Sequence, residues 1–301
     1  TLRKPHCSDN VNRIACPVAA ECGHLHILKR FMKVDKTPCD CLATHDVLPI
    51  LNWAAYGGHK RVVQWILETH KEWLKHPVPS TMQAAARGGQ LELMKWLHFD
   101  LNYSWNGGAC SMAAGNGHLH VLKWLYHEAR SDNVVSAAAW DHQGPWSREM
   151  IWRAARGGHL DVLVWLNDTI NRLGFWAGAG DCDEAAKIGR LDILQYAYSK
   201  GVTITEAAAR NAAENGHLHI LQWMRSALGA SLLLSEVAFQ HAARRGQLEV
   251  LKWGHTQNLL RNPSRLFKGA SDYVQDETAA WLFETFGNRA CFGDTPTPNL
   301  A

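Results

Sequence analysis

Three pairs of histidines stand two residues apart, a spacing that could bring two imidazoles to one metal ion. Each pair belongs to the same local pattern, and other copies of that pattern carry Glu or Asp at the second position. Residues two apart on a helix do not face each other. We therefore interpret the first histidine as a turn residue that hydrogen-bonds backbone and the second as a polar surface residue. The pairs are His24 and His26, His118 and His120, and His217 and His219.

Cysteines offer a second metal candidate. Cys39 and Cys41 are two residues apart, with Cys16, Cys22 and His24 upstream. Zinc prefers such ligands, but structural zinc sites use paired C-x₂-C spacing, which is absent here. The 8 cysteines of the chain follow no regular spacing. We therefore predict no metal, and reduced thiols in a cytoplasmic or nuclear protein, because disulfide scaffolds are short and dense in cysteine.

A glycine-rich stretch at 174–180 is the candidate for a phosphate loop. It contains Phe175 and Trp176 and lacks the Gly-Lys-Ser/Thr sequence of such loops. Acidic and histidine residues are spread along the chain in a repeated register and do not gather around one reactive position. The sequence therefore predicts no enzyme, no cofactor and no small-molecule substrate.

The register itself comes from an internal repeat. The stretch 113–125 reads AAGNGHLHVLKWL, and seven further stretches match AAxxGxLxxLxW at intervals of about 30 residues. The small Ala pair suits the end of a closely packed helix, and Gly supplies the positive φ that ends it. LxxLxW, with the residue after Trp, gives a second helix one apolar stripe. The matches begin at Ala19, Ala54, Ala85, Ala113, Ala154, Ala185, Ala212 and Ala242.

Repeats of this kind stack into one elongated domain. We predict an all-α solenoid of about eight to nine helix-turn-helix units, with repeats over 19–260. Residues 1–18 form a flank or atypical start, and Pro17 is expected to shorten the first helix. Residues 261–290 form a degenerate capping repeat, which keeps Ala and Trp-Leu but lacks Gly. Residues 291–301 form a flexible tail.

Several residues are expected at helix starts. Ser80, Ser147 and Ser235 are candidate N-caps. Thr203 and Glu206 have the spacing of a capping box. Pro49 suits the first turn of a helix. The longest insertions between repeats are residues 127–145 and 167–180.

The repeats resemble ankyrin repeats. Ala113, Ala114, Gly117, His118 and Leu119 match the A-A-x-x-G-H-L part of that signature, and the resemblance covers roughly residues 19–254. No copy contains T-P-L-H. The Trp-Leu ending resembles a divergent class common in microbial eukaryotes and large DNA viruses. A tetratricopeptide solenoid is the other fold considered, but its W-x₂-L-G-x₂-Y pattern is absent.

Tryptophan is abundant, and its positions fall into three groups. Seven share one register of the second helix and are expected in the core, as are Trp53 and Trp152 just before an Ala pair. Five fall outside these registers and either pack under loops or contact a partner, since exposed aromatics are enriched at interface anchors. The register residues are Trp65, Trp96, Trp124, Trp165, Trp223, Trp253 and Trp281. The five others are Trp73, Trp105, Trp140, Trp146 and Trp176.

Two variable positions lie between each Ala pair and its Gly, and the ankyrin resemblance implies that they lie near a concave binding face. Five of these residues are basic, and Tyr56 is aromatic. Because equivalent positions align in a stack, the basic residues would form an interrupted ladder for an acidic protein surface; ordinary solvated charge is the alternative. They are Arg87, Arg156, Lys187, Arg244 and Arg245.

The composition is that of a folded protein, with 47% hydrophobic and 20% charged residues and a net charge of +3. Such a charge argues against nucleic acid, and no apolar run reaches the roughly 18 residues that suggest a membrane span. We predict a non-catalytic scaffold for protein–protein interaction through the concave face and the inter-repeat loops. A permanent subunit of a larger complex, or less favourably a nucleic-acid-binding module, is the alternative.

Overall fold

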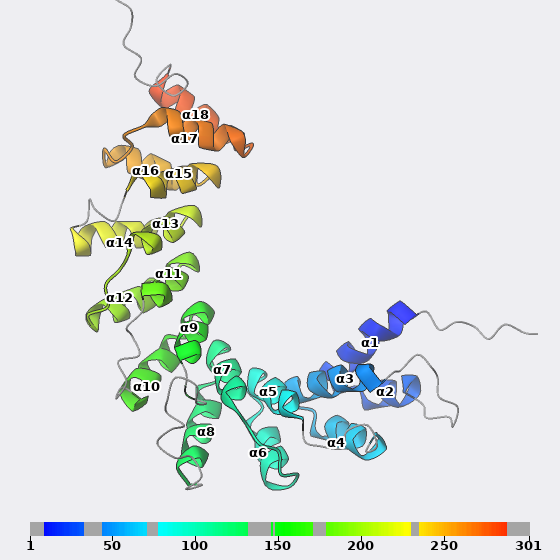
Figure 1. Ribbon diagram of the computed structural model, residues 1–301. Coiled ribbons are helices and arrows are strands. Elements are labelled where there is room, and N and C mark those ends of the chain that lie inside the picture. Colours follow the sequence, from blue (N-terminus) through cyan, green and yellow to red (C-terminus); the bar gives the residue numbers. More distant parts are fainter. Residues whose placement is uncertain are drawn as a thin grey trace, which may run out of the picture. The chain divides into compact units, whose positions relative to one another are not determined.

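The computed structural model describes residues 9–32, 44–70, 78–131, 146, 148–170, 179–229 and 235–287. All regular structure within these ranges is helical, from α1 to α18 (Figure 1). The chain divides into two compact units, Thr1–Trp165 and Leu166–Ala301. No helix in the described ranges is long and apolar enough to cross a membrane.

The helices come in consecutive pairs, one odd-numbered and one even-numbered. Unit 1 holds α1 (Asp9–Glu21), α2 (Leu25–Phe31), α3 (Thr44–Tyr56), α4 (Lys60–Thr69), α5 (Pro79–Arg87), α6 (Leu91–Phe99), α7 (Gly107–Gly115), α8 (Leu119–Ser131) and α9 (Arg148–Gly157), while α10 (Leu160–Ile170) runs across the division. Unit 2 holds α11 (Ala179–Lys187), α12 (Leu191–Ser199), α13 (Glu206–Glu214), α14 (Leu218–Leu228), α15 (Glu236–Arg244), α16 (Leu248–Thr256), α17 (Pro263–Asp272) and α18 (Asp276–Phe286).

Within each unit the odd-numbered helices form the closely packed layer. Each packs on the odd-numbered helices before and after it, whereas an even-numbered helix packs chiefly on the odd-numbered helix of its own pair. The Ala pairs explain this closeness, since Ala113 and Ala114 are fully buried and allow the neighbouring backbones to approach. The odd-numbered helices therefore lie closer together than the even-numbered ones within each unit.

The turn inside each pair has the conformation expected from its glycine. Gly117 has φ 75°, a value that L side chains rarely adopt. The His118 amide donates to the Ala113 carbonyl at 2.9 Å, which closes the end of α7. The next helix then begins at Leu119.

The same glycine receives a side chain from the next repeat. A Cβ on Gly117 would lie 2.5 Å from Nδ1 of His159, and one on Gly89 would lie 2.7 Å from Nδ1 of His118. Gln90 occupies the equivalent place over Gly58. The glycine therefore both turns the chain and leaves space in which the following repeat docks.

The tryptophan register differs from the expected core. All seven side chains are only partly buried, and the fully buried position is the following residue, for example Leu97 or Leu125. The Trp side chain instead packs against the even-numbered helix of the preceding repeat. Trp124 lies edge-on to His98 at 6.0 Å, and Trp165 lies edge-on to Tyr126 at 5.7 Å. These tryptophan side chains thus connect neighbouring even-numbered helices at their edges.

Several helix starts also differ from expectation. Helix α5 begins at Pro79 with Val78 as N-cap, so Ser80 lies inside it. Thr205, and not Thr203, caps α13 by accepting from the Ala208 amide at 3.4 Å. Ser235 does occupy the N-cap of α15, without a side-chain capping bond.

Both prolines expected near helix starts lie further inside their helices. Helix α1 continues past Pro17 to Glu21, and Pro49 stands in the interior of α3. A proline lacks one amide donor. Each helix therefore tolerates the loss of a hydrogen bond within its own ladder.

The last helix pair repeats the same turn with a different residue. Val274 stands where the earlier turns have Gly and adopts φ 56°. The Gln275 amide donates to the Ala270 carbonyl at 2.9 Å, as the residue after Gly does in the earlier turns. Residues 291–301 lie outside the described ranges.

Candidate protein-interaction surface

The variable positions lie at the C-terminal ends of the odd-numbered helices, where the next repeat holds their backbone. Gln90 Nε2 donates to the Tyr56 carbonyl at 3.1 Å, and His118 Nε2 lies 2.9 Å from the Arg87 carbonyl. Since a carbonyl only accepts, Nε2 of His118 carries the proton. The backbone at these positions is therefore fixed by the stack, while the side chain is free to vary.

In unit 1 these ends carry a cluster of Trp53, Tyr56 and Arg87. The Trp53 and Tyr56 rings meet edge-on at 5.8 Å, and the Arg87 guanidinium lies 5.6 Å from the Tyr56 ring centre. Trp53 is 37% exposed, which corrects the expectation that it belongs to the core. Trp, Tyr and Arg are the residue types that most often dominate binding energy at protein interfaces.

A second cluster with the same chemistry lies on α9. The Arg156 guanidinium stacks 5.2 Å from the centre of the partly buried Trp152 ring. Arg153 pairs with Glu149 at 2.7 Å on the same helix. On the intervening helix α7 the equivalent variable position is Gly115, which has no side chain. Unit 1 thus presents two aromatic and arginine clusters separated by a position without a side chain.

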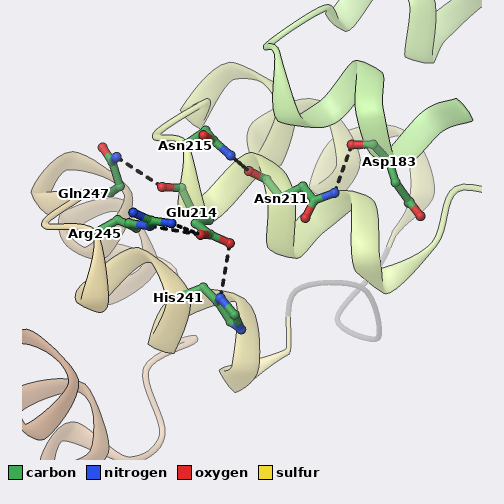
Figure 2. Close-up of polar contacts among 7 residues, drawn as sticks. All are labelled: Asp183, Asn211, Glu214, Asn215, His241, Arg245 and Gln247. Atoms are coloured by element: carbon green, nitrogen blue, oxygen red, sulfur yellow. Dashed lines mark hydrogen bonds and ion pairs between the residues drawn. The ribbon is translucent and has the colours of Figure 1, made fainter. Parts of the chain in front are cut away.

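In unit 2 the corresponding layer is a network of polar contacts, and Figure 2 shows it around Glu214. Arg245 Nη2 lies 3.0 Å from Glu214 Oε1, and His241 Nδ1 lies 3.3 Å from Oε2 of the same carboxylate. Gln247 Nε2 donates to the Glu214 carbonyl at 3.2 Å. The charge of Arg245 is therefore already balanced within the chain.

The network continues toward the beginning of unit 2 through amide side chains. Asn211 donates to the Asp183 carbonyl at 3.0 Å, and Asn215 donates to the Asn211 carbonyl at 2.8 Å (Figure 2). These bonds link α11 to α13 and close the end of α13. They hold side chains of this layer to backbone and leave fewer groups for a partner than unit 1 does.

The two remaining basic residues of unit 2 also have neighbours. Lys187 Nζ lies 3.8 Å from Glu184 Oε1, and Arg244 lies 6.0 Å from the centre of the Tyr273 ring. Arg87 and Arg156 have no ion-pair partner among the described residues. Arg244 likewise has no ion-pair partner among the described residues, so the basic variable positions without such a partner are two in unit 1 and one in unit 2.

The tryptophans predicted outside the core fall in different environments. Trp146 is 1% exposed and lies 5.6 Å from the Tyr126 ring, so of its two predicted roles it takes the packing role. Trp105 is partly exposed before α7. Trp140 and Trp176 lie outside the described residues, as do Trp73, Cys39 and Cys41 and most of the two insertions.

The histidine pairs do not point apart as expected. The ring centres of His118 and His120 are 5.9 Å apart, because His118 precedes the helix. His120 Nε2 lies 2.9 Å from the Gly89 carbonyl, so this residue also joins its repeat to the preceding one. Among the described residues no group of three or more His, Cys, Asp or Glu could hold a metal ion.

Among the described cysteines, Cys16, Cys22 and Cys110 are free thiols. Cys110 and Cys182 are fully buried, and burial raises the pKa of the Cys110 thiol far above its ordinary value. Cys16 is also buried, and Cys22 is exposed. A protonated, buried thiol is a poor nucleophile, so Cys110 acts as a small core residue.

These features define the fold class as all-α, with helix pairs that pack in sequence order. A comparison with models of known protein families finds no match, and a comparison with curated proteins finds no significant relative.

Proposed function

We propose that the chain is a non-catalytic scaffold built of divergent ankyrin repeats, and that it binds a partner protein through its odd-numbered helix layer. The observation that carries the proposal is the cluster of Trp53, Tyr56 and Arg87. Exposed Trp and Tyr supply apolar contact area at a small cost in side-chain entropy. Arg87 adds a planar donor that suits carboxylates.

The partner surface proposed for unit 1 is acidic with an apolar centre. Arg87 and Arg156 flank the position of Gly115, so carboxylates at the edge of a partner could meet both guanidinium groups. Complementary charge of this kind raises the association rate and specificity more than the affinity. Binding is therefore expected to weaken, without being abolished, as salt rises.

The test compares two double variants with the same kinds of substitution on opposite layers. Trp53→Ala with Arg87→Glu alters the odd-numbered layer, and Phe99→Ala with Lys123→Glu alters exposed residues of the even-numbered layer. A partner captured from the source cell is identified, purified and titrated against each variant by calorimetry.

The odd-layer variant is expected to bind at least about 30-fold more weakly, because a hot-spot residue contributes about 2 kcal/mol. The even-layer variant is expected to bind like the wild type. Equal losses in both variants, or a loss in the even-layer variant alone, would refute the proposed surface.

A further inference from the structure

A different surface of unit 1 carries an unbalanced positive charge. An open groove of about 590 Å³ lies between the N-terminal ends of α2 and α4. Lys29, Lys60 and Arg61 line it, together with His26 and His59, and the residues that line it include no acidic side chain. The three Lys and Arg side chains are exposed to solvent. The groove is on the even-numbered side and is separate from the Trp53 cluster.

Two other repeats pair the Lys at this register with an acid, whereas the fourth repeat, with His120 and Lys123, resembles the first. Lys95 and Lys252 occupy the register of Lys29, and each pairs with a Glu three residues earlier, at 2.8 and 2.9 Å. In the first repeat that earlier residue is His26. Lys29 has no ion-pair partner among the described residues. The acidic counterion that the third and eighth repeats carry is therefore missing here.

In the second repeat a basic residue occupies the register of His26, where the third and eighth repeats carry an acid. Arg61 stands where the third and eighth repeats have Glu92 and Glu249, and it also lacks an ion-pair partner within the described ranges. Positive side chains in the first turn of a helix oppose the helix dipole. Lys60 and Arg61 thus create an unfavourable helix start that a bound anion would stabilise.

The backbone of α4 supplies a further donor. The amide of Arg61 has no acceptor in the described part of the chain. At the same register in α12 stands Asp192, whose pKa is lowered chiefly by the hydrogen bonds that Arg190 donates to its carboxylate. An acid therefore fills this place in α12, whereas in α4 the place is open to an external anion.

We propose that the groove between α2 and α4 binds a phosphate group through Lys29, Arg61 and the start of α4. These donors come from two helices, which suits a tetrahedral dianion better than a planar carboxylate, and the Arg61 fork matches two phosphate oxygens. Lys60 contributes less, because its Nζ lies 4.8 Å from the centre of the Trp96 ring. The phosphate comes from a small phosphorylated compound or from a phosphorylated side chain of a protein.

The test titrates the whole chain by calorimetry with inorganic pyrophosphate, with a phosphoserine peptide, and with the same peptide carrying Glu in place of phosphoserine. Wild-type chain is expected to bind at least one phosphorylated probe. Tighter binding of pyrophosphate than of the phosphopeptide indicates a small phosphorylated compound as the source of the phosphate. Tighter binding of the phosphopeptide indicates a phosphorylated side chain of a protein. Absence of binding to both, or binding of the Glu peptide as tight as that of the tighter phosphorylated probe, would overturn the proposal.

The decisive variant is Arg61→Glu, which installs the residue that the third and eighth repeats carry. It is expected to weaken binding of the phosphorylated probe at least tenfold while the melting temperature stays equal or rises, since Glu favours a helix start. Lys123→Glu, at the register of Lys29 in the fourth repeat, is the matched control and should leave binding unchanged. Equal losses in the two variants would assign the binding to general surface charge and refute the site.

Discussion

At the scale of single residues, one contact repeats through both units: a His or Gln side chain of one repeat lies over the turn glycine of the repeat before it. His118 shows the complete arrangement, because its ring covers Gly89 and its Nε2 bonds the Arg87 carbonyl. Gln90 and Gln247 serve the same purpose in other repeats. The turn glycine of one repeat and the His or Gln of the next repeat therefore act together to connect the two repeats.

Gly117→Ala should be strongly destabilising. The backbone at this position is left-handed, a conformation that costs an L residue about 1–2 kcal/mol, and the new Cβ would lie 2.5 Å from His159 Nδ1. We expect a loss of at least about 2 kcal/mol in the free energy of unfolding, measured by urea denaturation. Gly180→Ala is the control, since no atom lies within 4 Å of the added Cβ. A loss no larger than that of the control would contradict the docking role of Gly117.

The stability of the chain should fall below about pH 6.5. Burial lowers the pKa of His118, and the nearby His120 and His159 lower it further. The folded state therefore favours neutral imidazole, and the unfolded state takes up a proton first as the pH drops through the ordinary value near 6.5. The loss continues until the pH reaches the lowered pKa of the folded state.

His118→Gln separates this titration from the hydrogen bond. Gln keeps a donor for the Arg87 carbonyl, as Gln90 does for Tyr56. Urea midpoints are compared between pH 7.5 and pH 5.5, and the variant should lose less stability than the wild type. Equal losses in both proteins would show that His118 does not contribute to the pH dependence; His70, whose pKa burial also lowers, would then be the next residue to replace.

At the scale of helices and turns, the AAxxG pattern predicted the helix pairs and their turns well. Ala and Gly leave few alternatives, because only small residues fit between the odd-numbered helices and Gly is favoured at positive φ. The tryptophan register could not be placed in the same way. Periodicity shows that Trp124 lies near the apolar stripe but not that the neighbouring helix α6 covers only its edge. Likewise, the cap of α5 depends on Pro79, which starts the helix earlier than Ser80.

The turn of the last helix pair offers a test of backbone strain. Val274 has φ 56° and is 76% exposed, so few contacts offset the cost of a β-branched residue in this conformation. Val274→Gly should raise the free energy of unfolding by about 1 kcal/mol. Val274→Ala retains a Cβ and should give little of that gain. A destabilised Gly variant would contradict the interpretation that this turn is strained.

At the scale of the whole molecule, the sequence indicates which variable positions could contact a partner. It does not show which of the basic residues at these positions are paired with an acid of the same chain. Arg87 and Arg156 lie at helix ends as the repeat register implied. Arg245 carries the same charge at such an end but is paired with Glu214, a partner that lies 31 residues away in sequence. The position of Trp53 just before an Ala pair predicts a core residue, whereas its side chain is 37% exposed. The signal that points outward is its variability, since the third repeat has Ala84 in the same place.

The central claim is that the odd-numbered layer of unit 1 contacts the partner. Hydroxyl-radical footprinting of the chain, alone and saturated with its purified partner, measures the solvent access of individual aromatic side chains. Trp53 and Tyr56 should be modified in the free chain and protected in the complex, while Phe99, which is 63% exposed on the even-numbered layer, stays reactive. Protection of Phe99 with unchanged reactivity of Trp53 and Tyr56 would contradict the account.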